Sequence, residues 1–246
     1  MTTIGDDGRQ DGRLVGTDLS FDVEGRRVLD TVSVAAEPGR MLAVTGSSGS
    51  GKTTLLTLVG GLAKPATGTA TYDGGPVTTK AGDPLPGTGF VLQSYGLVPT
   101  LTAAENVSIA LRGRGVGPVE ATEKAVQALG RVGVDELADR LISELSGGQL
   151  QRVAVARALV VEAAVLLADE PTSELDEANR DVVVGQLRME ANRGAVVLVA
   201  THDPAVAEEC DEEVHLVDGR IEVHEAPPPP PEPGHEHDAF MRPGTS

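Results

Sequence analysis

The sequence of 246 residues has little of what several classes of protein require. Cys210 is the only cysteine, which excludes an internal disulfide and a cysteine-rich metal site, and we expect it to be a half-buried packing residue. The most apolar stretch, Val153 to Ala168, is interrupted by Arg157 and Glu162, so it falls short of the roughly 18 apolar residues of a membrane-spanning helix. The chain opens with polar residues and glycines rather than a secretory leader, so we expect a cytoplasmic protein.

Basic residues are also scarce, since 20 Lys and Arg stand against 37 Asp and Glu and give a net charge of −17. A nucleic-acid-binding surface needs clustered Lys and Arg, so we expect no nucleic-acid partner. The same balance argues against direct adsorption to anionic lipid. What the chain does have is 40% hydrophobic residues, which is enough for one sizeable core.

The two ends of the chain differ from its middle. Residues 1–12 carry Gly, Asp and Thr without an apolar period, and we expect a flexible tail there. Residues 225–246 contain Pro227–Pro231, a polyproline II segment, followed by Gly, His and acidic residues. A disordered tail is the simplest interpretation. A ligand for a partner protein and a weak metal site at His235 and His237 are the alternatives.

Between the tails, residues 13–224 alternate short β-branched runs with helical stretches, which predicts a single α/β domain without internal repeats. Strands are expected at Met41–Thr45, Phe90–Leu92, Val165–Ala168 and Val196–Ala200. Helices are expected at Lys52–Leu62, Val119–Val132, Gly148–Val161, Glu177–Asn192 and Pro204–Cys210, the last with Asp203 as its N-cap. Short local signals add hairpin turns at Tyr72–Gly75 and Asp218-Gly219 and a capping box at Thr102–Glu105.

A glycine-rich string between the first of these strands and the first helix fits the phosphate-binding loop pattern in full. Its glycines let backbone N–H groups surround a phosphate, and the helix N-terminus adds a positive dipole. Lys52 is expected to reach the β- and γ-phosphate oxygens, and the Thr53 hydroxyl to bind Mg²⁺. The predicted nucleotide-binding residues are Gly46, Ser47, Ser48, Gly49, Ser50, Gly51, Lys52, Thr53 and Thr54.

Two further strings carry chemistry in this context. The apolar strand Val165–Ala168 ends in Asp169 and Glu170, at the edge of the sheet where a γ-phosphate would lie. Asp169 is expected to bind Mg²⁺ and Glu170 to polarise the attacking water. A second anion cradle without a lysine opens the helix near residue 148, and consists of Leu145, Ser146, Gly147, Gly148 and Gln149.

The chain resembles the nucleotide-binding domains of ABC transporters in three strings that occur in the same order, Gly46–Thr54, Leu145–Gln149 and Val165–Glu170. The resemblance covers residues 13–224 and implies a P-loop NTPase core of the RecA-like α/β type. It also implies an antiparallel β subdomain, and an α-helical signature subdomain over about residues 94–160. ATP and Mg²⁺ are the implied cofactors, and ATP hydrolysis is the implied reaction.

The resemblance assigns roles to further residues. Gln93 falls at the Q-loop, which contacts Mg²⁺ and the lytic water, and His202 matches the switch histidine that contacts the γ-phosphate. Asp176 falls in the D-loop, Ser173–Asp176, which bridges two subunits. The family mechanism implies two copies, or a copy and a paralogous cassette, that sandwich two ATP molecules. Each phosphate loop then faces the partner's Ser146–Gln149, and the dimer drives an integral membrane permease from the cytoplasmic face of the cell membrane.

A finer resemblance lies in Gln93–Leu111, which is similar to the branch that serves macrolide exporters and lipoprotein-release systems. Two positions depart from the family. Val23 stands where an aromatic residue usually stacks on adenine, with Phe21 two residues earlier on the same strand face. Glu174 stands in the D-loop where a small or amide residue is usual.

Two other functions remain open from the sequence. A soluble cassette acting on ribosomes or DNA usually has two cassettes or a coiled-coil insertion and a basic surface, and this chain has none of these. A degenerate scaffold that does not hydrolyse ATP would be expected to lack some of the catalytic residues, all of which are present: Lys52, Asp169, Glu170 and His202.

Overall fold

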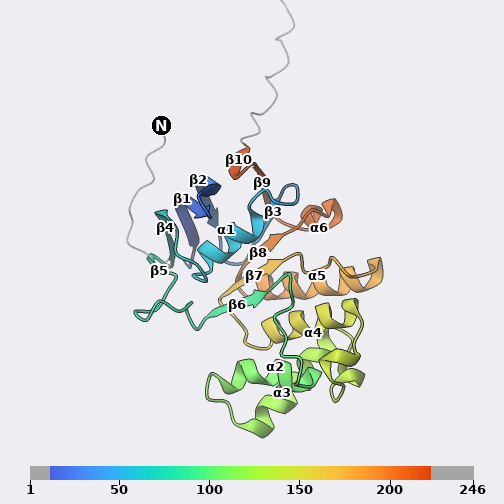
Figure 1. Ribbon diagram of the computed structural model, residues 1–246. Helices are drawn as coiled ribbons and strands as arrows, with labels where there is room; N and C mark the ends of the chain where they lie inside the picture. The colour runs from blue at the N-terminus through green and yellow to red at the C-terminus, as the bar shows by residue number, and fades with distance from the viewer. Residues whose placement is uncertain (1–11, 223–246) are drawn as a thin grey trace, which may run out of the picture.

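The computed structural model describes residues 12–222, which form two sheets and a set of helices (Figure 1). The expected N-terminal tail, apart from Gly12, and the proline-rich tail at 225–246 with His235 and His237 lie outside the described residues. Within residues 12–222, no helix is long and apolar enough to cross a membrane.

A six-stranded sheet forms the centre of the molecule, in the order β10-β9-β3-β8-β7-β6. Its strands run parallel except β10, which pairs antiparallel with β9 through a turn at Asp218-Gly219. The strands are β3 (Met41–Thr45), β6 (Thr88–Val91), β7 (Val165–Asp169), β8 (Val196–Ala200), β9 (Glu212–Val217) and β10 (Arg220–Glu222). Every residue of β3, β7 and β8 is buried, as their continuous apolar runs predict.

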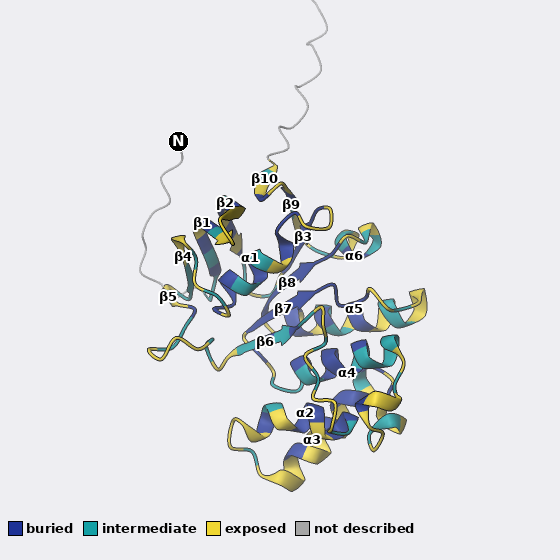
Figure 2. Cartoon of the chain, in the orientation of Figure 1, coloured by how far each residue is buried: buried dark blue, intermediate teal, exposed yellow. Residues whose placement is uncertain are grey.

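Alternate side chains of these strands face two separate cores, because successive residues of a strand point to opposite faces. Leu166, Ala168, Val197 and Val199 pack under α4 (Gly147–Leu159) and α5 (Glu177–Asn192). On the other face, residues such as Leu167 and Leu198 pack with α1 (Lys52–Val59) and the second sheet. Figure 2 shows the buried strands between these covering layers.

The second sheet is antiparallel and has the order β2-β1-β4-β5. Its strands are β1 (Leu14–Val23), β2 (Arg26–Ala36), β4 (Thr67–Tyr72) and β5 (Gly75–Pro76). Tyr72 pairs with Gly75, which confirms the predicted hairpin turn. Between β1 and β2 the register shifts, so that Phe21 faces Leu29 while Asp22 faces Arg27, and Val28 is left without a cross-strand partner.

The helical part of the chain lies at the bottom of Figure 1, away from the antiparallel sheet. It contains α2 (Ala103–Arg112), α3 (Pro118–Arg131), two short 3₁₀ turns (Asp135–Leu137 and Ile142–Glu144) and α4. Capping boxes begin α2 at Thr102 and α4 at Ser146, the first as predicted. This architecture confirms the expected α/β cassette with its antiparallel β subdomain.

Some element ends differ from those predicted. The first helix ends at Val59 rather than Leu62, because two glycines follow it. The last helix, α6 (Pro204–Glu208), begins at its Asp203 cap as predicted but stops two residues early. The chain turns there and brings the Asp211 carboxylate to within 2.7 Å of the backbone nitrogen of Met41.

Other ends shift by one or two residues. The strand expected at Phe90–Leu92 runs from Thr88 to Val91, and α4 ends at Leu159 rather than Val161. Cys210 is half-buried against the core, as expected, and burial raises the pKa of its thiol to about 11.

Candidate functional site

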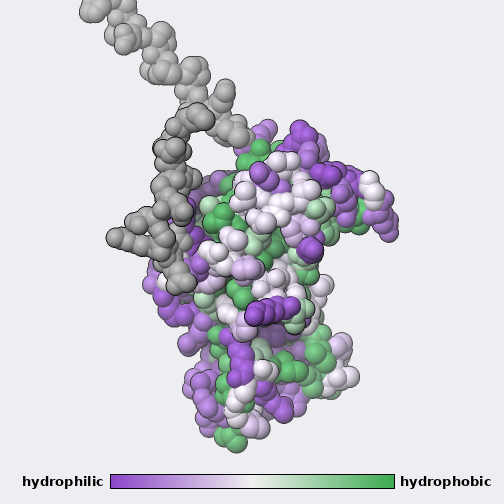
Figure 3. Space-filling view, turned by 90° about the vertical axis from the view of Figure 1, so that its left-hand side faces the viewer, coloured by the Kyte–Doolittle hydropathy of each residue, from purple (hydrophilic) through white to green (hydrophobic). Residues whose placement is uncertain are grey.

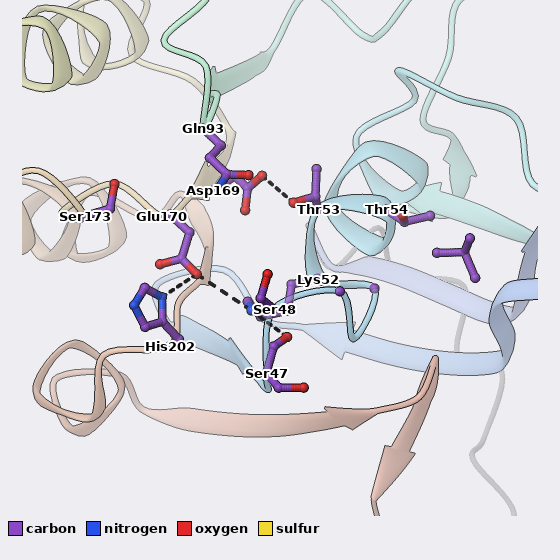
Figure 4. Close-up of a pocket in the computed structure, with 13 residues that line it drawn as sticks. Ser47, Ser48, Lys52, Thr53, Thr54, Gln93, Asp169, Glu170, Ser173 and His202 are labelled. Carbon is purple, nitrogen blue, oxygen red and sulfur yellow. Dashed lines mark hydrogen bonds and ion pairs between the residues drawn. The ribbon is translucent and has the colours of Figure 1, made fainter. Parts of the chain in front are cut away.

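The carboxyl ends of β3, β7 and β8 meet at a pocket of about 460 Å³ beside the N-terminus of α1 (Figure 4). Parallel strands present their carboxyl ends at one edge of a sheet, which is where α/β folds bind ligands. Most of the sequence-predicted nucleotide residues line this pocket: Ser47, Ser48, Gly49, Gly51, Lys52, Thr53, Thr54, Gln93, Asp169, Glu170 and His202. Gly46 and Ser50 belong to the same loop but are not among the lining residues.

The loop from Gly46 to Thr53 has the geometry of an anion cradle. Helix α1 begins after Gly51, whose φ of 111° is a conformation that glycine adopts readily. No side chain of residues 12–222 caps the first N–H groups of this helix. Lys52 is buried, and its Nζ donates to the carbonyl oxygens of Gly46 at 2.8 Å and Ser47 at 3.2 Å. The positive charge therefore sits in the curve of the loop, beside N–H groups that are free to bind an anion.

Asp169 ends β7 and faces the start of α1. Its Oδ2 accepts a hydrogen bond from Thr53 Oγ1 at 2.7 Å, while its buried Oδ1 has no hydrogen-bond partner among residues 12–222. Burial raises the pKa of this carboxyl, and the hydrogen bond from Thr53 opposes the shift. A buried carboxylate, a hydroxyl and the nearby Gln93 amide are oxygen donors of the kind that Mg²⁺ prefers.

Glu170 follows Asp169 directly and lies beside the carboxyl ends of β7 and β8. Its Oε1 is 2.9 Å from His202 Nδ1 and 3.7 Å from Lys52 Nζ, as the dashed lines in Figure 4 show. Its backbone adopts a φ of 48°, and its N–H donates to the Ala200 carbonyl of β8 at 2.9 Å. A left-handed backbone at a residue other than glycine is uncommon, and here it turns the Glu170 carboxylate back over the loop.

The signature loop, Leu145–Gln149, does not line this pocket in the single chain. Ser146 caps α4, with its Oγ accepting from the Gln149 backbone N–H and its own N–H donating to Gln149 Oε1. Gly147 and Gly148 lie against Glu174, so the D-loop and the signature loop of one chain are in contact. Asp176 is the N-cap of α5 and accepts from Asn179 at 2.9 Å.

Two pocket residues were not predicted as nucleotide contacts from the sequence. Ser173 was identified only as part of the D-loop, and Val28 was not identified at all. Val28 lies at the register shift between β1 and β2, a feature that no local sequence pattern predicts. Among residues 12–222, no aromatic side chain lines the pocket: Phe21 packs against the core, and Val23 is 47% exposed and is not a lining residue.

Comparison with known proteins agrees with this geometry. A family model described as ABC transporter matches residues 29–173. The macrolide export ATP-binding/permease protein MacB of Salmonella choleraesuis (strain SC-B67) is 40% identical over 205 residues, and MacB of Salmonella typhi is equally similar. The match covers 81% of this chain but 32% of MacB, so the chain spans about a third of these relatives.

Solved structures give the same result. The dimeric structure of MJ0796, a bacterial ABC transporter cassette, has a TM-score of 0.79 and 30% identity, over 85% of this chain and 97% of that one. A post-hydrolysis state of MJ0796 bound to ADP and Pi has the same TM-score and identity. The similarity to MacB confirms the branch that Gln93–Leu111 predicted. The chain therefore belongs to the ABC transporter family, as an ATPase cassette similar to that of MacB.

Proposed function

We propose that the chain binds MgATP with its phosphates on the Gly46–Thr54 loop, hydrolyses it as a dimer and drives a separate membrane permease. The observation that carries this proposal is the convergence of Lys52, Asp169, Glu170 and His202 on one pocket at the start of α1. The phosphate loop supplies backbone N–H groups, and Lys52 supplies a buried positive charge. On nucleotide binding the Lys52 ammonium would exchange the Gly46 and Ser47 carbonyls for phosphate oxygens.

Thr53, Asp169 and Gln93 are the residues that would hold Mg²⁺. The Asp169 Oδ1 fits this role, because a bound cation would satisfy a buried oxygen that has no hydrogen-bond partner among residues 12–222. When bound, the ion would neutralise charge on the phosphate oxygens. This ion keeps several waters and shares its coordination with the phosphates, so one buried carboxylate, one hydroxyl and one amide oxygen are enough protein ligands.

Glu170 would orient the attacking water at the γ-phosphate. Phosphoryl transfer needs a positioned nucleophile more than a strong base, and Glu170 is held in place by its backbone and by His202. His202 is two-thirds exposed, so it can reach outward to a γ-phosphate while its Nδ1 keeps contact with Glu170. These two residues would therefore link the presence of the γ-phosphate to the position of the water.

The dimer is proposed because the signature loop is outside the chain's own pocket. Ser146, Gly147 and the N-terminus of α4 form a cradle with no charged side chain, which fits a phosphate supplied by another subunit. Two copies, or a copy and a paralogous cassette, would place each signature loop on the partner's nucleotide, with Asp176 of the D-loop at the seam. The dimeric cassette structure of MJ0796 supports this arrangement.

The permease is proposed from the relatives. MacB is named as an ATP-binding/permease protein, and this chain corresponds to about a third of it. The Gln93–Leu111 segment is the proposed docking region, and it exposes apolar side chains at Val98 and Ile109. Figure 3 shows that hydrophobic surface on the visible face forms separate patches, several of them on the lower, helical part. The chain would thus sit on the cytoplasmic face of a cell membrane, attached to a permease of the macrolide-exporter and lipoprotein-release type.

Replacing Glu170 by Gln tests the catalytic assignment. The amide keeps the shape of the side chain but cannot polarise the water, so turnover should fall at least about 100-fold while MgATP affinity stays within about twofold. Size-exclusion chromatography with MgATP should then show a stable dimer. Glu123→Gln on the exposed side of α3 is the matched control and should behave like the wild type. Unchanged turnover in the Glu170 variant would contradict the assignment.

A further inference from the structure

A polar cluster lies beside the phosphate loop and outside the nucleotide pocket. Thr45, the last residue of β3, is the register partner of His215 on the parallel strand β9. Thr45 Oγ1 is 2.5 Å from Glu213 Oε1 and 2.8 Å from His215 Nδ1. We call these three residues the Thr45 cluster. Thr45 and His215 are 170 residues apart in sequence, and none of the three residues lines the nucleotide pocket.

The cluster has a defined direction of hydrogen bonding. A threonine hydroxyl has one proton to donate, and an ionised carboxylate can only accept. Thr45 therefore donates to Glu213, and the ring of His215 must carry its proton on Nδ1 and donate to Thr45. The hydroxyl is held from both sides, which fixes the side chain of the residue that immediately precedes Gly46.

The same hairpin touches the phosphate loop at two further points. The carbonyl oxygen of Leu216, next to His215, lies so close to Gly46 that a Cβ there would collide with it. At the other end of the loop, the Gly219 N–H donates to the Ser50 carbonyl at 3.0 Å. The hairpin formed by β9 and β10 thus supports the loop at Thr45, Gly46 and Ser50.

The far side of the cluster opens to a separate hollow. It has a volume of about 430 Å³ and is lined by Glu213, Val214 and His215 of β9 and by Ile221 and Glu222 of β10. Substitution of Glu213 or His215 therefore changes a side chain that lines this hollow, and it leaves every side chain that lines the nucleotide pocket unchanged.

We propose that His215 and Glu213 are positioning residues for the phosphate loop and act on it through Thr45. Backbone N–H groups bind an anion only when the loop holds them in a convergent arrangement. Fixing Thr45 and Gly46 restricts the first residues of that loop before the nucleotide arrives, and pre-organisation of this kind raises affinity. This inference rests on the proposed binding of ATP phosphates at Gly46–Thr54.

The test measures MgATP affinity by titration calorimetry, and KM and kcat by steady-state hydrolysis, on the full chain. Thr45→Val keeps the shape of the side chain but removes the hydroxyl, and His215→Ala removes one of its two partners. Each should raise the dissociation constant and KM for MgATP about threefold to tenfold, as expected for a lost hydrogen bond, with kcat within about twofold. His215→Asn places an amide near the position of Nδ1 and should restore most of the affinity.

A double variant and a control separate this role from a general loss of stability. If His215 acts through Thr45, then Thr45→Val combined with His215→Ala should bind MgATP no more weakly than Thr45→Val alone. Glu213→Gln should weaken affinity, whereas Glu212→Gln, whose side chain pairs with Arg40 instead, should not.

Four outcomes would overturn the inference while leaving the proposed function intact. They are unchanged affinity in Thr45→Val, fully additive losses in the double variant, no recovery in His215→Asn, and an equal loss in Glu212→Gln. A wild-type chain that fails to bind MgATP would overturn the proposed function as well.

Discussion

Helices α1 and α4 both begin at glycine-rich loops, but their N-termini differ. Before α1 the N-cap is Gly51 and no side chain in the described part of the chain caps the first N–H groups, while Lys52 brings a buried charge. Before α4 the N-cap is Ser146, and a capping box with Gln149 already satisfies two backbone N–H groups, with no charged side chain in the loop. These differences support the proposal that the first N-terminus binds a phosphate group by itself, and that the second contributes only part of a phosphate site.

The surroundings of the two loops differ in the same way. The first faces two buried carboxylates, Asp169 and Glu170, within its own pocket. In the second, Ser146 is exposed and the other four residues are half-buried, and the loop lies against Glu174, a negative charge that opposes an incoming phosphate. In the proposed function, one chain therefore supplies a nearly complete phosphate site and a separate half-site, and the proposed dimer brings each half-site to the partner's phosphate site.

The strongest test of this comparison is Ser146→Arg. A long charged side chain at the cap would fill the half-site, so hydrolysis should fall at least about 100-fold, as when a transition-state donor is removed. MgATP binding by the single chain should stay within about twofold of wild type, since the signature loop is not part of its pocket. Full hydrolysis in this variant would show that the signature loop is not needed.

Lys52→Ala tests the other N-terminus. The variant removes the buried charge from the loop and should weaken MgATP binding by about 10-fold to 100-fold, as expected for a hydrogen bond to a charged group. Calorimetric titration measures the affinity, and circular dichroism checks that the fold is kept. Lys124→Ala, on the exposed face of α3 where Lys124 pairs with Glu120, is the control. Equal affinity in wild type and Lys52→Ala would mean that the cradle binds without its charge.

Val23→Tyr tests base recognition at the proposed phosphate site, where Val28 is the only apolar side chain of residues 12–222 that lines the pocket. An aromatic side chain at position 23 should stack on adenine and tighten ATP binding about fivefold, near the lower end of base–aromatic stacking. Wild type should discriminate weakly between ATP and GTP when the two dissociation constants are measured side by side. Strong ATP preference in wild type would show that another residue recognises the base.

Glu174→Gln is expected to have the smallest effect. It removes an exposed negative charge from beside Gly147, so two copies should associate about threefold more tightly around MgATP, as befits a screened surface charge. The measurement uses the non-hydrolysing Glu170→Gln background and analytical ultracentrifugation at two salt concentrations. The gain should shrink as ionic strength rises, and a gain independent of salt would rule out an electrostatic cause.

The parts of the fold that the sequence predicted depend on local patterns. Continuous apolar runs identified β3 and β8 to the residue, and capping signals identified the starts of α2 and α6. The phosphate loop and the Asp169-Glu170 pair could be related to one another because each follows a strand of the same parallel sheet. Local hydrogen bonding and burial determine these features, so neighbouring residues are enough to find them.

The parts that could not be predicted depend on tertiary contacts. Val28 reaches the pocket because the β1–β2 register shifts, and that shift arises from pairing between two strands. The Thr45 cluster joins residues from opposite ends of the chain, each of which is unremarkable alone. The contact between Glu174 and the signature glycines likewise exists only after the helical part packs on the core. No pattern within one segment contains this information.

The left-handed backbone of Glu170 limits how this cassette could lose its activity. Only glycine adopts a φ of 48° without cost, Asn and Asp tolerate it better than most residues, and β-branched side chains strongly disfavour it. Substitution by Gln, as in the variant proposed above, or by Gly, Asn or Asp would remove or misplace the carboxylate and leave the turn from β7 intact. Substitution by Val or Ile would disturb the turn as well. Only a small set of substitutions at this position is therefore expected to give a cassette that folds but does not hydrolyse ATP. Those residues are the ones to look for in relatives that bind nucleotide without hydrolysing it.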